Sequence, residues 1–269
     1  MRQSSTLTGE LRGLPTVKAP DTLLPEVLRR VGLADSYWRL ESPVGTVYIA
    51  HSPAGISMVT RAKSPSEFEA AFRRQHGRSV YPEKHVAPAE IQSRVKRLKG
   101  RDPSRGDGSG GSRGMDLRFD LRGLSEFERA VLLKALEIPP GEVRPYSWIA
   151  REIGHPGAVR AAGSALAKNP VPLLIPCHRV VRSDGHIGNY SLGGPRNKRT
   201  LLELEGAQPG TLERLASTGV RYLGNAKGKH YCYPTCGGIS TLILSNHVPF
   251  RDERDAAAAG FHPCKDCRP

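Results

Sequence analysis

The most informative stretch of the chain is Ile175-Pro176-Cys177-His178-Arg179-Val180. A cysteine thiol must lose its proton before it becomes a good nucleophile, and a neighbouring histidine can accept that proton directly or through a water. Arg179 would add positive potential that favours the thiolate. An isolated Cys-His pair is also typical of a buried structural cysteine beside a hydrogen-bonded histidine. The segments on either side must therefore decide between these interpretations.

Two short helices are expected just before this stretch, at Ser147–Ile153 and Ala158–Lys168. Their spacing resembles a helix-turn-helix, although many helix pairs share it. The second helix is poor in large side chains. Ala161 and Gly163 would let another molecule approach closely, and Arg160 projects near the start of the helix.

The segment that follows predicts a hairpin and a last helix. Val180–Gly188 has Ser-Asp-Gly at its centre, which is a turn pattern, and this hairpin could form a wing beside the helix pair. Pro195 begins a helix that presents three leucines and ends at Gly206; the leucines are Leu201, Leu202 and Leu204.

The first part of the chain predicts a small α/β lobe. Residues 36–61 alternate apolar and polar side chains, which indicates two or three antiparallel strands. Ser64-Pro65-Ser66-Glu67 and Ser125-Glu126-Phe127-Glu128 are capping boxes that open helices, and a further helix is expected over Pro88–Leu98. Residues 100–114 consist almost entirely of Gly, Ser, Arg and Asp and predict a flexible loop, after which Leu117–Leu121 is strand-like.

The charge balance indicates a polyanionic partner. Lys and Arg number 40 against 26 Asp and Glu, a net charge of +14, and the isoelectric point is near 9.9. No apolar run approaches the ~20 residues that a membrane span needs, and the first residues lack the apolar core of a secretion signal. We therefore expect a cytoplasmic protein, nucleoid-associated if the source is bacterial, with no membrane partner.

Several motifs together resemble one family. GEVRPYSWIA (residues 141–150), AVRAAGSALAKNPVPLLIPCHRVV (158–181), GHIGNYSLGG (185–194) and LLELEG (201–206) resemble the active-site domain of the O6-alkylguanine-DNA alkyltransferases. Residues 36–121 fit the family's N-terminal lobe, an α/β unit similar to ribonuclease H. The resemblance implies an α+β chain, in which a ribonuclease H-like lobe precedes a winged helix-turn-helix-like alkyltransferase domain and a small zinc-binding module.

The implied domain boundaries follow from these motifs. Residues 1–35 form an N-terminal extension of unassigned role, and 36–121 the lobe with its loop. Residues 122–206 form the active-site and DNA-binding domain, and 207–269 the metal-binding module.

The resemblance also assigns roles at the reacting centre. Cys177 matches the thiolate that accepts the alkyl group, His178 the base that works through a water, and Glu205 the carboxylate that orients this histidine. Asn169 matches the residue that ties the hinge before the active-site strand. Tyr146 matches the tyrosine that rotates the target phosphate and assists proton transfer to the leaving guanine.

Other matches concern DNA. Arg160 matches the arginine that fills the gap left by a flipped nucleotide, on a helix that lies in the minor groove in this family and carries Ala161 and Gly163. Tyr190 matches the aromatic wall over the base, Ser191 a backbone donor to O6, and the Val180 carbonyl an acceptor for the exocyclic amine. One extra residue after Ser191 makes the alignment of Glu205 less direct than that of Cys177.

The implied activity is stoichiometric DNA repair. The alkyl group of O6-alkylguanine, and by the same resemblance of O4-alkylthymine, moves from double-stranded DNA to Cys177, and the protein inactivates itself. In-line attack on the alkyl carbon requires the base to leave the stack. A non-catalytic protein that senses damaged DNA with the same pocket is the main alternative, and a cysteine hydrolase is a third. We expect a monomer.

Four further cysteines gather in the last forty residues. Cys232 and Cys236 have three residues between them, and Cys264 and Cys267 have two. Two such pairs predict a tetrahedral Zn²⁺ site, and a unit of about 50 residues is helped by a metal staple. Disulfides are the alternative in an oxidising compartment. No organic cofactor is expected.

The same segment resembles the metal-binding domain of the Ada DNA-repair protein through KHYCYPTC (229–236), NHVPF (246–250), AAAAGF (256–261) and PCKDCRP (263–269). In Ada the first of these cysteines, here Cys232, accepts methyl groups from DNA phosphotriesters. Tyr233 and His262 stand where arginine is common, which weakens phosphate contacts. Two interpretations stay open, a structural site and a second acceptor at Cys232.

Overall fold

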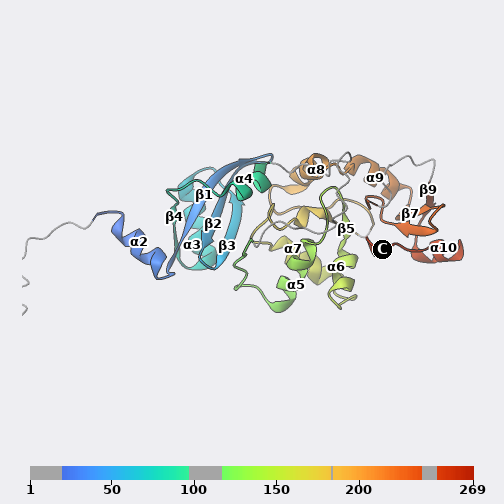
Figure 1. The fold of residues 1–269 in the computed structure, drawn as a ribbon, viewed down its shortest axis with the longest axis horizontal. Coiled ribbons are helices and arrows are strands. Elements are labelled where there is room, and N and C mark those ends of the chain that lie inside the picture. Colours follow the sequence, from blue (N-terminus) through green and yellow to red (C-terminus); the bar gives the residue numbers. More distant parts are fainter. Residues whose placement is uncertain (1–19, 97–116, 183, 238–246) are drawn as a thin grey trace, which may run out of the picture.

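The computed structural model describes residues 20–96, 117–182, 184–237 and 247–269. It is a mixed α+β chain whose three parts follow one another along the longest axis (Figure 1). The predicted loop 100–114 and most of the predicted extension 1–35 lie outside the described residues. Among the described residues, no helix is long and apolar enough to cross a membrane.

The first part is a four-stranded sheet with two helices, preceded by helix α2. The strand order is β3-β2-β1-β4, with β1, β2 and β3 antiparallel and β4 parallel to β1. The bounds are α2 Leu23–Arg30, β1 Ala34–Ser42, β2 Gly45–Ser52, β3 Gly55–Arg61, α3 Pro65–His76, β4 Ser79–Pro82 and α4 Ala89–Lys96. Two or three strands were predicted within residues 36–61; the structure has three, and the first begins two residues earlier than expected.

Helix α3 begins and ends as the sequence predicts. The Ser64 hydroxyl accepts from the Glu67 amide, and Gly77 ends the helix in the left-handed region at φ 67°. The Glu67 carboxylate accepts from the Lys63 amide, at 2.7 Å. Phe68 and Phe72 point from this helix into a core on one face of the sheet.

The middle part carries the predicted helix pair. Helices α6 and α7 pack on α5, and the short strands β5 and β6 pair in parallel beneath them. The capping box at Ser125 is complete, because Glu128 also accepts from the Ser125 amide. The bounds are α5 Glu126–Ala135, β5 Arg144–Pro145, α6 Tyr146–Glu152, α7 Val159–Ala167, a 3₁₀ helix Cys177–Arg179, β6 Val180–Val181, α8 Gly194–Leu204 and α9 Pro209–Ser217.

Two local predictions are wrong. Residues 117–121 form no strand and make one isolated bridge, in which the Ile56 amide donates to the Arg118 carbonyl and the Asp120 amide donates to the Ile56 carbonyl. In Val180–Gly188 the Arg182 amide bonds to the His186 carbonyl across a turn, but β6 pairs with β5 and not with a second hairpin strand. Of the three leucines expected on the last helix, Leu201 and Leu202 are buried and Leu204 is 45% exposed.

The last part is a small sheet with one helix. Its strand order is β10-β8-β7-β9. The bounds are β7 Tyr222–Asn225, β8 His230–Cys232, β9 His247–Phe250, α10 Glu253–Ala258 and β10 His262–Pro263. Gly224 on β7 has no room for a side chain, because an added Cβ would lie 2.6 Å from Phe250 and 2.8 Å from Phe261.

One continuous apolar core runs through all three parts. It includes Ile49 of the first sheet, Trp148 and Leu201 of the middle part, and Leu223 and Tyr233 of the last. The last part is therefore packed against the middle part and shares its core.

Candidate active site

Cys177 begins the 3₁₀ helix and is buried, with 6% of its surface exposed. The Asn169 amide nitrogen donates to its Sγ at 3.1 Å and to the Ile175 carbonyl at 3.0 Å. The Asn169 side-chain oxygen accepts from the Val171 amide at 3.0 Å. One side chain therefore holds both ends of the segment that leads to the thiol.

This segment contains a strained residue. Leu173 lies at φ 73°, a conformation that non-glycine residues rarely adopt, and its side chain is buried. Such a conformation persists only when the surroundings enforce it. The Asn169 bonds and the bridge between Pro172 and Ile175 enforce it here.

His178, Arg179 and Glu205 form a buried cluster behind the thiol. His178 Nε2 lies 3.0 Å from Glu205 Oε1, and both side chains are at most 1% exposed. Arg179 donates to the same carboxylate through Nε at 2.9 Å and its terminal nitrogen at 2.7 Å, and to the Ile138 carbonyl at 2.6 Å. The structure brings Glu205 to His178 despite the extra residue after Ser191.

The charges in this cluster fix the tautomer of His178. Burial alone would raise the pKa of Glu205, but bonds from His178 and Arg179 lower it to about 2. An ionised carboxylate can only accept, so Nε2 carries the hydrogen. Burial lowers the pKa of His178 and keeps the ring neutral, which leaves Nδ1 with a free lone pair. Nδ1 is buried without a hydrogen-bond partner among the described residues, so this atom can take up a proton.

The cation that acts on the thiol is Lys198. Burial raises the pKa of Cys177, while the Asn169 hydrogen bond and then the charge of Lys198 lower it. Lys198 is fully buried on α8 and donates to the Val180 carbonyl at 2.6 Å. Sequence analysis expected this effect from Arg179, whose charge is instead compensated by Glu205.

Two tyrosines border this centre. The Tyr190 ring meets His178 edge to face, with ring centroids 6.0 Å apart. Burial, followed by the charge of Cys177, raises the pKa of both Tyr190 and Tyr146. The Tyr146 ring lies 3.9 Å from where a Cβ on Gly163 would be, so the glycine brings α7 close to this ring.

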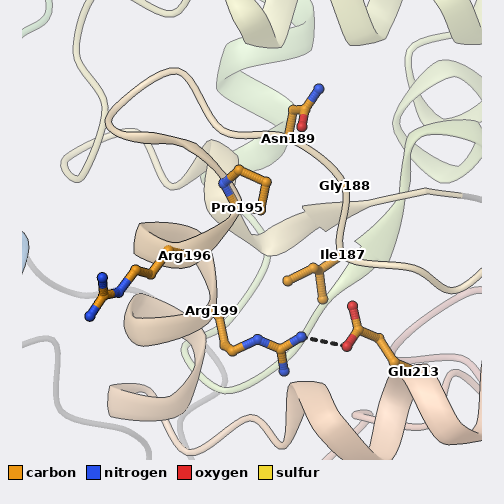
Figure 2. A pocket seen from close by; sticks show the side chains of 7 residues that line it. All are labelled: Ile187, Gly188, Asn189, Pro195, Arg196, Arg199 and Glu213. Atoms are coloured by element: carbon orange, nitrogen blue, oxygen red, sulfur yellow. Dashed lines mark hydrogen bonds and ion pairs between the residues drawn. The ribbon is translucent and has the colours of Figure 1, made fainter.

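The remaining predicted site residues differ in how far they are exposed to solvent. Arg160, Ala161 and Ser191 are exposed, and Val180 is buried with its carbonyl already accepting from Lys198. Figure 2 shows a hollow between the 187–189 loop and helices α8 and α9, where Arg199 pairs with Glu213 at 2.5 Å. Its lining includes none of Cys177, His178 and Glu205.

The four clustered cysteines meet as predicted. All four cysteines are buried and none forms a disulfide, and their Sγ atoms lie within 4.8 Å of one another. A tetrahedral metal with Zn–S bonds of about 2.3 Å would place sulfurs roughly 3.8 Å apart, so the arrangement fits. The sulfurs are brought together by β8, which ends at Cys232, and by the Cys264 amide, which donates to the Tyr231 carbonyl at 3.0 Å.

Comparison with known proteins assigns both parts. Residues 126–207 match the family model of the 6-O-methylguanine DNA methyltransferase DNA-binding domain, and residues 214–269 match the metal binding domain of Ada. The methylated-DNA–protein-cysteine methyltransferase of Rattus norvegicus is 49% identical over 100 residues, which are 37% of this chain and 46% of that protein. That of Mycobacterium bovis is 48% identical over 90 residues, 34% and 53% of the two chains.

The domain at residues 126–207 belongs to the 6-O-methylguanine DNA methyltransferase family. The chain spans about half the length of the curated relatives it matches. A solved structure, Mycobacterium tuberculosis OGT in complex with DNA, is 30% identical and covers 66% of this chain and 99% of its own, with a TM-score of 0.49. The methyltransferase domain contains Cys177, His178 and Glu205, and the Ada-type domain contains the four clustered cysteines.

Sequence analysis missed Lys198. A signal for it was present, because Lys198, Leu202 and Glu205 recur at positions i, i+4 and i+7 and therefore share one face of α8. The contacts between the methyltransferase domain and the Ada-type domain were missed as well, since nothing in the sequence pairs Val143 with a residue as distant as Thr235.

Proposed function

We propose that this chain repairs DNA by moving the alkyl group from O6 of guanine to Cys177. Two buried hydrogen bonds inside the matched domain support this proposal: one joins Asn169 to Cys177, and the other joins His178 to Glu205. Double-stranded DNA that contains O6-alkylguanine is the proposed substrate, and O4-alkylthymine a further one. The protein acts as a monomer.

The proposed reaction begins with the thiol proton. Neutral His178 takes it up at Nδ1 through a water, and Glu205 stabilises the imidazolium that results. The thiolate sulfur then attacks the alkyl carbon, so that a C–S bond forms while the C–O6 bond breaks. The leaving guanine gains a proton with the help of Tyr146. The product is a thioether on Cys177, so each molecule reacts once.

The test is a single-turnover reaction with an oligonucleotide that carries one O6-methylguanine. Peptide mass spectrometry should find one added methyl group, on Cys177, and none in Cys177→Ser. A folded wild-type protein that binds this DNA but gains no methyl group would instead support the damage-sensing alternative. Turnover of a peptide or ester substrate would point to a hydrolase.

The metal of the Ada-type domain is proposed to be zinc in a structural role. Zinc would hold the four thiolates and so fix the fold of this domain. Cys232 is fully buried, and Tyr233, which stands where arginine is common, is 7% exposed and does not face solvent. A phosphotriester therefore has no cationic side chain at that position to bind it. Randomly methylated DNA should leave Cys232 unmodified in the same peptide digest.

Replacing Arg160 by alanine is expected to slow transfer on duplex DNA by about tenfold and to leave transfer from free O6-methylguanine base unchanged. Extrusion of a base costs a few kcal/mol, and a side chain in the gap offsets part of this cost. Single-turnover rates on the two substrates measure the difference. Arg214→Ala, which removes an exposed arginine from α9, serves as the charge control. An equal loss on both substrates would contradict the assignment.

Replacing Lys198 by methionine is expected to raise the pH of half-maximal transfer by about one unit, because the buried ammonium lowers the pKa of Cys177. Burial lowers the pKa of Lys198 itself to about 8, so the wild type loses this advantage above that pH. Transfer rates from free O6-methylguanine between pH 6 and 9 measure the shift, with Lys134→Met as control. An unchanged profile would rule out this role.

A further inference from the structure

The Ada-type domain contacts the methyltransferase domain at the strand that leads into Tyr146. The Val143 amide donates to Thr235 Oγ1 at 2.8 Å, and the Gly237 amide donates to Glu142 Oε1 at 3.0 Å. Both contacts come from the loop between Cys232 and Cys236 or from the residue that directly follows it. A metal bound by these cysteines would therefore fix the position of the contacting groups.

Arg144 is the centre of this contact. Its guanidinium lies 5.6 Å from the ring centroid of Tyr233 and 5.8 Å from that of Trp148, so it is held between two aromatic faces. Arg144 also pairs with Glu142 at 2.5 Å, and its side chain is buried. Tyr233 covers a buried ion pair that would otherwise face solvent or an empty interface.

A second contact comes from the other cysteine pair. Arg268, next to Cys267, has its guanidinium 5.6 Å from the Trp148 ring centroid and pairs with Glu152 at 3.0 Å. The Arg151 side chain donates to the Arg268 carbonyl at 2.6 Å. Helix α6 is thus contacted by Arg268 beside Cys267 directly, and by Tyr233 beside Cys232 through Arg144.

A short stretch of backbone connects this contact to the reacting centre. Arg144 and Pro145 form β5, and Tyr146 begins α6 without a side-chain cap at the helix start. Strand β5 pairs with β6, which directly follows the Cys177–Arg179 turn. A shift of β5 would therefore move Tyr146 relative to Cys177.

We propose that Tyr233 is a positioning residue for alkyl transfer. Its ring holds Arg144 and β5, and thereby sets Tyr146 against the Cys177 centre, so that metal binding in the Ada-type domain supports chemistry in the methyltransferase domain. This inference rests on the proposed function, because Tyr146 is assigned there to assist proton transfer to the leaving guanine.

The test compares Tyr233→Leu with Tyr231→Leu. Both tyrosines neighbour Cys232, but Tyr231 packs inside the Ada-type domain against Phe250 and Phe261. Leucine keeps apolar bulk at either site and removes the aromatic face. Each change is made in the full-length wild type and in a Tyr146→Phe background, and metal content and thermal unfolding are measured for all four proteins.

Tyr233→Leu is expected to slow transfer from O6-methylguanine in duplex DNA by about tenfold in the wild type, and by less than about twofold when Tyr146 is already phenylalanine. Tyr231→Leu should lower thermal stability without this pattern. An equal loss in both backgrounds, or no loss in either, would overturn the proposal. Tyr233→Phe, which keeps the ring, should restore the wild-type rate.

A second readout does not depend on transfer. Hydrogen exchange at the amides of residues 144–150 should quicken in Tyr233→Leu and stay unchanged in Tyr231→Leu, with metal bound in both. If the wild type gains no methyl group, the proposed function fails while this measurement still decides whether Tyr233 holds β5. Should Tyr233→Leu lose its metal, the pair Glu142→Gln with Arg144→Met removes the same contact without leaving a buried charge unpaired.

Discussion

Replacing Glu205 by glutamine is expected to slow alkyl transfer to Cys177 by at least about 10²-fold, within the range seen for general acid–base groups. The carboxylate orients His178 and stabilises the imidazolium, and a neutral amide in its place would also leave Arg179 without its anionic partner. Single-turnover rates on O6-methylguanine DNA measure the loss. Glu203→Gln, an exposed position on the same helix, is the matched control and should react like the wild type.

The same substitution should change acid stability. Because the pKa of Glu205 is lowered from 4.5 to about 2, its stabilising contribution is present above pH 4.5 and is lost as the pH falls toward 2. That contribution is about 3 kcal/mol for a shift of this size. The free energy of unfolding should be measured from pH 6 to pH 2.5. Its fall with decreasing pH, the acid limb, should be less steep in Glu205→Gln than in the wild type. A limb identical to the wild type would contradict the proposed ionisation.

Removal of the metal is expected to destabilise the methyltransferase domain as well as the Ada-type domain. Structural zinc contributes about 10–16 kcal/mol to isolated zinc-finger peptides. If only ~3 kcal/mol of this reaches the shared core, the Tm of the methyltransferase domain falls by about 12–24 °C. The chain has two tryptophans, Trp38 and Trp148, so Trp148 fluorescence in a Trp38→Phe background reports on the interface.

The controls separate metal loss from chelator effects. Zinc added back to the stripped protein should restore the transition, and Cys267→Ser should reproduce the stripped state without chelator. An unchanged Trp148 transition after complete loss of metal would show that the two domains unfold independently, and would remove the physical basis for a shared core.

Several local features of the fold could be predicted because short-range rules govern them. The Ser125 capping box, the α6–α7 pair and the convergence of four cysteines all follow from spacing along the chain. The site residues came instead from resemblance, and their roles stay predictions, as do the domain boundaries, the ribonuclease H-like assignment and the identity of the metal.

What could not be predicted depends on long-range packing. Lys198 was overlooked because a lysine on a helix is usually exposed, and only the three-dimensional fold places it under Val180. The strand expected at Leu117–Leu121 and the hairpin at Val180–Gly188 failed for a related reason. In each case the backbone partner comes from a distant segment, Ile56 in one and Arg144 in the other.

The continuous core has a consequence for how this protein can be divided. A fragment that stops at Gly206 would keep every reacting group. It would, however, expose Trp148 and remove the Tyr233 ring that packs on the Arg144–Glu142 ion pair. Such a fragment would expose an apolar, partly charged surface that is buried in the intact chain, and this surface would favour aggregation. The Ada-type domain therefore cannot be removed without exposing part of the core, and shorter versions of this chain should end elsewhere or carry new polar residues along β5 and α6.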